Sequence, residues 1–329
     1  MSDAITTENL GKRFGEVVAV EGVDLRVPAG TVLGLLGPNG AGKTTIVRML
    51  TTILRPDSGR ATVLGHDVAA SPHAVRATIG LAGQYAAVDE NLTGRENLRM
   101  VAKLTHLPRS GITARGDELL ERFDLVASAD RPVRTYSGGM RRRLDLAAAL
   151  VQNPPVLFLD EPTTGLDPRG RNDLWTVIGE LVADGTTVLL TTQYLEEAER
   201  LADAIVVIDG GRVIAEGTAE ALKQRLAATV FEVRMGDPAA AERARTAVGE
   251  VAPGEVLDDG RTVSLSVGDA GPALLAVVRA LDAGGLTPEW VTVREPTLDD
   301  VFLQLTGSRS RPAEATAAGG ARKRRRGAA

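Results

Sequence analysis

The sequence contains no cysteine and few aromatic residues, which make up 3% of its 329 positions. The absence of cysteine excludes disulfide bonds and thiolate metal sites, and it is compatible with a reducing cytoplasm. The apolar runs, such as 146–151 and 204–208, are far shorter than the roughly 20 residues that a membrane-spanning helix requires. Residues 1–4 begin no signal peptide. If the protein serves a membrane process, we expect it to do so from the aqueous side.

The chain also lacks an excess of positive charge. Its 38 Lys and Arg residues stand against 43 Asp and Glu residues, which leaves a net charge of −5. This balance gives no reason to expect nucleic acid as the main partner. Hydrophobic residues at 43% and charged residues at 25% are typical of a globular protein. The length allows one large domain or two ordinary ones.

The most informative stretch is residues 37–45, Gly-Pro-Asn-Gly-Ala-Gly-Lys-Thr-Thr. An apolar run at 32–36 precedes it, and apolar residues recur at helical spacing after it, so the context is strand, glycine-rich turn and helix. Such a turn points successive backbone N–H groups at a phosphate, and the positive end of the helix faces the same anion. Lys43 can reach phosphate oxygens, and Thr44 can offer its hydroxyl to Mg²⁺. A glycine-rich turn that binds nothing is the alternative, and this context disfavours it.

A second feature is the pair of carboxylates Asp160 and Glu161 directly after the apolar run 156–159. Four apolar residues without alternation predict a parallel strand that is covered on both faces. The carboxyl end of such a strand is where doubly wound sheets place their ligands. Asp160 can hold Mg²⁺ directly or through water, and Glu161 can act as general base toward a water molecule. The alternative is a solvated acidic turn.

A third feature is Ser137-Gly138-Gly139, which opens a predicted helix. Ser137 is a suitable N-cap residue, and the two glycines leave helix-terminal N–H groups open to an approaching anion. Taken alone, these three residues are equally compatible with an ordinary capped helix.

Charged residues gather on one face of each of two predicted helices. On the helix after Ser137, Met140 and Leu144 share the apolar face, so residues 141–143 and Asp145 are predicted mostly on the opposite face. On a later helix, the glutamates are interpreted as a solvated face: Glu196, Glu197 and Glu199.

The order of the elements predicts an α/β fold with a helical insertion. Residues 5–10 and 19–27 are predicted to form two short strands joined by a turn. Residues 88–150 are predicted to be mainly helical, with helices over 92–104, 117–124 and 140–151.

After residue 228 the pattern changes. The order β-α-β-β-α-β over residues 228–307, with its last strand at 286–293, predicts a small ferredoxin-like domain. Residues 308–329 carry seven basic residues and one acidic residue without apolar periodicity, so we expect a disordered basic tail. A solvated tail is the default interpretation, and attraction to an anionic membrane surface is the alternative.

Together these motifs resemble the nucleotide-binding subunit of ATP-binding-cassette (ABC) transporters, over residues 5–225. The motifs stand in that family's order: the phosphate loop, Gln84, Ser137-Gly138-Gly139, Asp160-Glu161 and the turn 165–167. The resemblance implies a P-loop NTPase core over residues 1–225 with a helical subdomain at about 88–150, followed by a C-terminal α+β regulatory or docking domain at 228–307.

A narrower resemblance is to the daunorubicin/doxorubicin-resistance type of ATP-binding subunit. It rests on residues 136–144, 191–195 and 296–302. Proteins of this type energise a separate membrane permease that exports drugs or antibiotics. The resemblance therefore implies an ATPase that forms a homodimer, works with integral-membrane permease subunits and lies peripherally at the cytoplasmic face of the cell membrane.

The resemblance also implies roles for single residues. Phe14 corresponds to the aromatic residue that stacks on adenine. Ser137, Gly138 and Gly139 correspond to the signature that touches ATP held by the opposite subunit. Glu161 corresponds to the catalytic carboxylate. The residues that hold Mg²⁺ correspond to Thr44 and Asp160. The glutamine that senses Mg²⁺ and the attacking water, and that links to the permease, corresponds to Gln84. The phosphate contacts correspond to Gly37, Pro38, Asn39, Gly40, Ala41, Gly42, Lys43, Thr44 and Thr45.

One position departs from the general family pattern. Most cassette ATPases carry a histidine where this chain has Gln193. A glutamine can donate a hydrogen bond to the γ-phosphate, but it cannot carry positive charge. The drug-resistance type commonly has glutamine here, so Gln193 is interpreted as a trait of the subfamily that still assists catalysis, with more of the charge stabilisation left to Lys43 and Mg²⁺.

Other functions fit the motifs less well. A cassette ATPase that acts on DNA or ribosomes is disfavoured because the interval 88–136 is too short for a long coiled coil and the chain has one phosphate loop. A GTPase is disfavoured because no guanine-reading Asn-Lys-x-Asp segment is present. Export of a lipid or polysaccharide in place of a drug stays open, since contacts with the cargo are expected in the permease.

Overall fold

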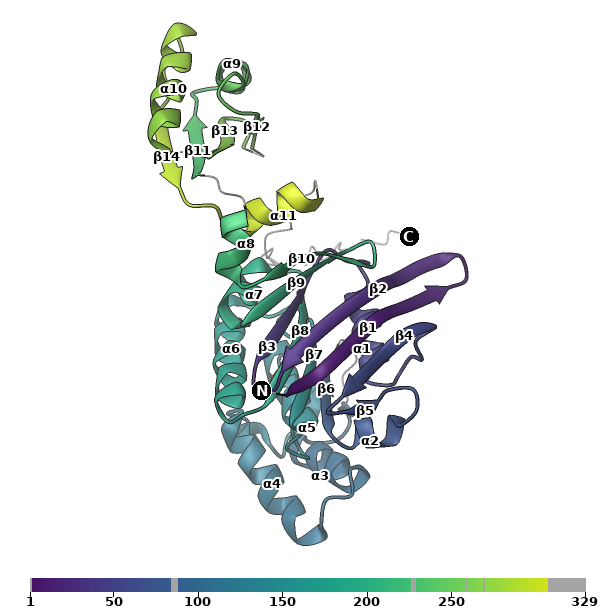
Figure 1. Cartoon of the computed structure of the whole chain (residues 1–329). Coiled ribbons are helices and arrows are strands. Elements are labelled where there is room, and N and C mark those ends of the chain that lie inside the picture. Colours follow the sequence, from purple (N-terminus) through teal and green to yellow (C-terminus); the bar gives the residue numbers. More distant parts are fainter. Residues whose placement is uncertain (1, 84–87, 226–228, 258, 269, 307–329) are drawn as a thin grey trace, which may run out of the picture. The chain divides into compact units, whose positions relative to one another are not determined.

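The computed structural model describes residues 2–83, 88–225, 229–257, 259–268 and 270–306. These residues form two compact units, residues 2–214 and residues 215–306, each described by itself below (Figure 1). Gln84 and the predicted tail at 308–329 lie outside the described residues.

The first unit is built on a six-stranded sheet in the order β10-β9-β3-β8-β7-β6. Its strands are β3 (Val32–Leu36), β6 (Ile79–Ala82), β7 (Val156–Asp160), β8 (Thr187–Thr192), β9 (Ala204–Asp209) and β10 (Arg212–Gly217). The pairings from β9 through β3, β8 and β7 to β6 are parallel. Every residue of β3, β7 and β8 is buried, so the strand predicted at 156–159 is confirmed.

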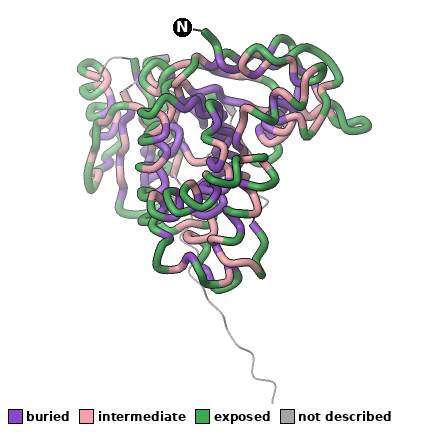
Figure 2. The backbone as a smooth tube through the Cα atoms, turned by 90° about the horizontal axis from the view of Figure 1, so that it is seen from below, coloured by how far each residue is buried: buried purple, intermediate pink, exposed green. Residues whose placement is uncertain are grey.

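Both faces of this sheet are covered, as its apolar runs predict. Successive residues of β7 enter different cores because side chains alternate along a strand. Val156 and Phe158 pack in a core with helix α1 (Lys43–Leu50). Leu157 and Leu159 pack in a core with helices α5 (Gly138–Ala149) and α6 (Pro168–Ala183). The buried residues follow the central strands, and the outer turns are exposed (Figure 2).

An antiparallel sheet in the order β2-β1-β4-β5 covers the α1 side of the parallel sheet. Its strands are β1 (Asp3–Phe14), β2 (Val17–Pro28), β4 (Ser58–Val63) and β5 (His66–Asp67), and helix α2 (Pro72–Arg76) follows. The two strands predicted as short are each 12 residues long. Their register shifts at several points. Such irregularities interrupt the alternation of apolar and polar residues by which a strand is recognised in a sequence.

The predicted helical insertion is present and contains α3 (Gly94–Leu104), α4 (Arg109–Arg122) and α5. Thr93 and Glu96 form a reciprocal capping box at the start of α3. Helix α4 begins at Arg109, so the start predicted at residue 117 is wrong. Two glycines in α4, Gly111 and Gly116, weaken its helix propensity, whereas its buried residues recur at helical spacing: Ile112, Gly116, Leu119 and Leu120.

The second unit has the predicted β-α-β-β-α-β order. Its sheet has the order β12-β13-β11-β14 with antiparallel pairings, as in a ferredoxin-like domain. The elements are α8 (Ala219–Arg225), β11 (Thr229–Arg234), α9 (Pro238–Val248), β12 (Gly254–Val256), β13 (Thr262–Val267), α10 (Ala270–Ala283), β14 (Trp290–Arg294) and α11 (Leu298–Thr306). The last strand begins at Trp290 rather than at residue 286. The domain limits at 225 and 228 stay a prediction, and α8 groups with the second unit.

Candidate functional site

The phosphate loop lies between the buried strand β3 and helix α1. At Gly37, a Cβ atom would lie 2.2 Å from the Ile208 carbonyl oxygen. Gly42 has a φ of +106°, and a Cβ atom there would lie 2.5 Å from the Ala19 carbonyl oxygen. Only glycine fits these two positions without strain. Among the described residues no side chain caps α1 at Gly42, so its first N–H groups are available to an anion.

Lys43 is buried within the loop that precedes it. Its Nζ donates to the carbonyl oxygens of Gly37 at 2.7 Å and Pro38 at 3.0 Å, and the residue is 4% exposed. Burial lowers the pKa of Lys43, and the nearby carboxylates of Glu161 and Asp160 oppose that shift. The ammonium group of Lys43 and the carboxylates of Asp160 and Glu161, which the sequence predicted separately, therefore lie close together.

Thr44 and Asp160 meet although they are 116 positions apart in the sequence. The Thr44 hydroxyl donates to Asp160 Oδ1 at 3.0 Å, and the Thr191 hydroxyl from β8 donates to the same oxygen at 2.6 Å. A hydroxyl and a carboxylate are ligand types that Mg²⁺ prefers, so these residues fit that ion. Among the described residues no cluster of three or more His, Cys, Asp or Glu side chains is placed to hold a metal. A Mg²⁺ site that is completed by phosphate oxygens of the nucleotide does not need such a cluster.

Glu161 follows directly and is 9% exposed. Its φ of +52° is uncommon for a residue with a Cβ atom, and its N–H donates to Thr191 in β8. The Thr164 hydroxyl donates to Glu161 Oε2 at 3.3 Å. Glu161 lines a cavity of about 310 Å³ together with Ala19 and loop residues 39–45. The strand end and the phosphate loop thus form one site.

None of the other predicted residues in the described part of the chain lines this cavity. Ser137 caps α5, with its hydroxyl oxygen accepting a bond from the Met140 N–H at 3.2 Å, so the predicted N-cap is confirmed. Residues 137–139 are not among those that line the cavity. Phe14 is 48% exposed, and Lys12 Nζ lies 5.7 Å from the centre of its ring. Gln193 directly follows β8, whose Thr192 pairs with Leu36 at the start of the loop.

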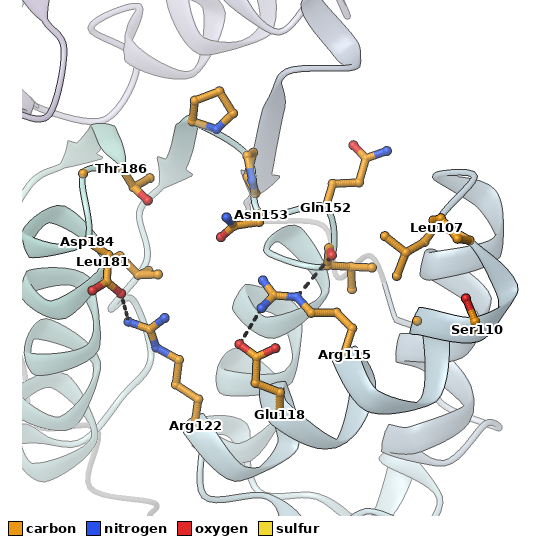
Figure 3. A pocket seen from close by; sticks show the side chains of 16 residues that line it. Leu107, Ser110, Arg115, Glu118, Arg122, Gln152, Asn153, Leu181, Asp184 and Thr186 are labelled. Atoms are coloured by element: carbon orange, nitrogen blue, oxygen red, sulfur yellow. Dashed lines mark hydrogen bonds and ion pairs between the residues drawn. The ribbon is translucent and has the colours of Figure 1, made fainter.

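A larger cavity of about 860 Å³ lies near the amino-terminal ends of β7 and β8, away from Asp160 (Figure 3). Its two arginines are already engaged: Arg115 pairs with Glu118, and Arg122 pairs with Asp184. The smaller cavity, in contrast, combines backbone N–H groups, a cation and a carboxylate. It is the site suited to a nucleotide phosphate.

Comparisons with known proteins agree with this geometry. Residues 20–164 match the model of the ABC transporter family. The chain is 55% identical to the daunorubicin resistance ATP-binding protein DrrA3 of Streptomyces coeruleorubidus, over 95% of this chain and 98% of that protein. It is 50% identical to the daunorubicin/doxorubicin resistance ATP-binding protein DrrA of Streptomyces peucetius, over 92% of each chain. The chain is an ABC-transporter ATP-binding subunit of the daunorubicin-resistance group.

A solved structure of an ATP-binding subunit of an ABC transporter is similar to this subunit, with a TM-score of 0.62 and 29% identity. The match covers 68% of this chain and 92% of that one. The P-loop NTPase cassette predicted from the sequence is thereby confirmed. The subunit is an ATPase that binds ATP.

The interpretation of residues 196–199 of the ATP-binding subunit as a solvated face is wrong for Glu197. Glu197, in α7 (Leu195–Leu201), has no exposed surface, and its Oε1 accepts a bond from Trp175 Nε1 at 3.2 Å. Arg142 in α5 reaches under the carboxyl end of β7, where it donates to the Glu161 carbonyl oxygen. Asp145, on the same helix, is buried as well. No sequence signal separates Arg142 from the arginines on either side of it.

Because Glu197 is buried, we expect it to make the stability of the subunit depend on pH. Desolvation raises the pKa of Glu197 above 4.5, and the Trp175 hydrogen bond and the charge of Arg142 only partly oppose this change. Because the folded state holds the proton more tightly, stability is lost as the pH rises from about 4.5 through the raised pKa. We expect Glu197→Gln to remove this loss. A pKa that differs by one between the folded and unfolded states corresponds to about 1.4 kcal/mol of stability.

The measurement is the free energy of unfolding from denaturant titrations at several pH values. Glu196→Gln is the matched control, because Glu196 is the exposed neighbour on the same helix. Its stability should follow the wild-type pH profile. Parallel profiles for wild type and Glu197→Gln would show that the proton is not held more tightly in the folded state.

Proposed function

We propose that the subunit hydrolyses ATP to energise export of a drug or antibiotic such as daunorubicin through a separate membrane permease. The names of its relatives, daunorubicin resistance proteins that match almost the whole chain, support the cargo class. One observation carries the ATPase role: Lys43 and Thr44 from the loop face Asp160 and Glu161 from the end of β7. This combination of cation, hydroxyl and paired carboxylates suits phosphoryl transfer to water.

In the proposed reaction, Lys43 binds the β- and γ-phosphates with the N–H groups of the loop. Thr44 and Asp160 hold Mg²⁺, which when bound supplies positive charge against the charge that develops on the transferred phosphoryl group. Glu161 accepts a proton from the attacking water as the water oxygen bonds to the γ-phosphorus and the bond to the oxygen shared with the β-phosphate breaks, so that ADP and phosphate are released. Gln193 donates a hydrogen bond to that group without adding charge.

The remaining predicted contacts concern the base of the nucleotide and the coupling step. The half-exposed ring of Phe14 stacks on adenine in this proposal. Gln84, which lies outside the described residues, keeps its proposed role of sensing Mg²⁺ and linking the site to the permease.

The signature glycines support a head-to-tail homodimer. A Cβ atom at Gly138 would meet nothing within 4 Å among the described residues, and at Gly139 its nearest neighbour, in Leu166, would be 3.9 Å away. Neither glycine has a positive φ, so the fold of one subunit does not require them. Glycine in a helix is unfavourable by up to about 1 kcal/mol relative to alanine. The need for glycine therefore comes from something that approaches α5, and in our proposal that is ATP held by the loop of the second subunit.

The subunit is proposed to lie peripherally at the cytoplasmic face of the membrane. Within the described ranges, none of its helices has the length and apolar character needed to cross a bilayer. In this proposal the permease supplies the membrane passage, and the seven basic residues beyond position 307 add attraction to anionic lipid.

The proposal is tested by drug accumulation in cells that express the subunit together with its permease. We expect cells with the wild-type pair to retain less daunorubicin than cells with the permease and Lys43→Ala, because the variant is expected to bind ATP much more weakly. The difference is measured by the fluorescence of the drug. Equal retention in the two strains would overturn drug export as the function.

A further inference from the structure

Arg142 lies in α5, called the signature helix here because the signature residues 137–139 begin it. It contacts the hydrolytic centre, by which we mean the carboxyl end of β7 with Asp160 and Glu161, and the neighbouring end of β6. Its Nε donates to the Pro162 carbonyl oxygen at 2.7 Å, and its Nη1 donates to the Gly83 carbonyl oxygen at 2.6 Å. Its Nη2 donates to the carbonyl oxygens of Asp160 at 3.1 Å and Glu161 at 2.8 Å. These acceptors lie at the carboxyl ends of β6 and β7, so α5 is tied to both strand ends.

The contacts of Arg142 bear on the conformation of Glu161. The Glu161 backbone has a positive φ, which the surrounding structure must support because an ordinary side chain disfavours it. The planar guanidinium donates in fixed directions, so it fixes the carbonyl groups on both sides of the Cα atom of Glu161. Arg142 is also partly shielded from solvent, with 16% of its side chain exposed. It is therefore a rigid support for the residue proposed as general base.

The neighbouring arginines do not share this environment. Arg141 pairs with Glu90, in a turn before α3, at 2.7 Å. Arg143 donates to the carbonyl oxygen of Phe123, directly after α4, at 3.1 Å. Burial lowers the pKa of Arg142, and four carboxylates oppose that change: Asp145, Glu197, Asp160 and Glu161. Of the three consecutive arginines, it is thus Arg142 that lies at the carboxyl end of β7.

We propose that Arg142 is a positioning residue for Glu161 and that it makes the signature helix and the hydrolytic centre of one subunit respond together. This inference rests on the proposed function, in which Ser137 serves the nucleotide of the second subunit while Glu161 serves its own. A shift of α5 when the two subunits close would reach the Glu161 backbone directly through the guanidinium. The rate at which a subunit hydrolyses its own ATP would thereby depend on whether its signature residues are bound to the ATP of the second subunit.

The test compares full-length Arg142→Gln and Arg142→Lys with the control Arg143→Gln. We expect kcat for ATP hydrolysis to fall at least about 10-fold in Arg142→Gln, since small displacements of a catalytic group have effects of this size. KM for ATP should stay within about two-fold, because the phosphate loop is untouched. Arg142→Lys should recover part of kcat, since it keeps the charge but cannot reach all four carbonyl oxygens. Arg143→Gln should keep wild-type values.

Equal kcat in Arg142→Gln and Arg143→Gln would overturn the inference. If Arg142→Gln does not fold, as judged by thermal unfolding, Arg142→Lys decides, and wild-type kcat in that variant would likewise overturn it. A second arm places Arg142→Gln in the Glu161→Gln background and measures pairing with Mg-ATP. The double variant should still pair, and failure would mean that Arg142 acts on pairing rather than on Glu161. If Glu161→Gln alone does not pair, the proposed function fails instead.

Discussion

Replacing Glu161 with glutamine is expected to lower ATP hydrolysis by about 100- to 10,000-fold, the range for loss of a general base. The amide keeps the size of the side chain but cannot accept the proton of the attacking water. Lys43, Thr44 and Asp160 are unchanged, so ATP should still bind. We also propose that hydrolysis lets the two subunits separate, so dimers containing Mg-ATP should accumulate when hydrolysis is blocked. Phosphate release measures the first effect, and size-exclusion chromatography with Mg-ATP measures the second.

The control for this experiment is Glu196→Gln, an exposed glutamate outside the cavity, which should keep wild-type turnover. Wild-type turnover in Glu161→Gln would show that Glu161 is not the base. Loss of hydrolysis without dimers would leave Glu161 as the base but would contradict the proposal that two subunits clamp ATP between them.

Replacing Lys43 with alanine is expected to weaken ATP binding by about 30-fold or more, from the loss of charge-assisted hydrogen bonds worth roughly 2 kcal/mol. Lys43 is the cation within the loop itself, and its Nζ already lies among the loop carbonyl oxygens. Burial lowers its pKa, so the ammonium group carries a desolvation cost in the folded subunit. The Lys43→Ala substitution should therefore weaken ATP binding without destabilising the fold.

Binding is measured by titration with a fluorescent ATP analogue, and folding is checked by thermal unfolding without nucleotide. Lys103→Ala is the matched control, because Lys103 is an exposed lysine on α3. It should bind as tightly as the wild type. An unchanged affinity in Lys43→Ala would count against the assignment of the phosphate loop.

Much of the fold was predictable because the signals were local. The strand–loop–helix context of residues 32–50 and the apolar strand before Asp160 depend on residues that are adjacent in the chain. The start of α4 was missed because Gly111 and Gly116 lower its helix propensity, whereas packing of Leu119 and its neighbours stabilises the helix in the structure. The long β1–β2 hairpin was underestimated because register shifts interrupt its alternation.

By itself the sequence determined the type of protein: the phosphate loop, the serine-glycine-glycine signature and the acidic strand end stand in an order specific to cassette ATPases. Only the tertiary structure decided that Glu197 is buried and that Arg142 reaches the carbonyl groups on both sides of Glu161. Helical spacing indicates which residues share a face, but not what packs against that face. Apart from its ion pair with Asp145, Arg142 binds backbone carbonyl groups, which every residue carries. Such contacts leave no trace in the order of the side chains.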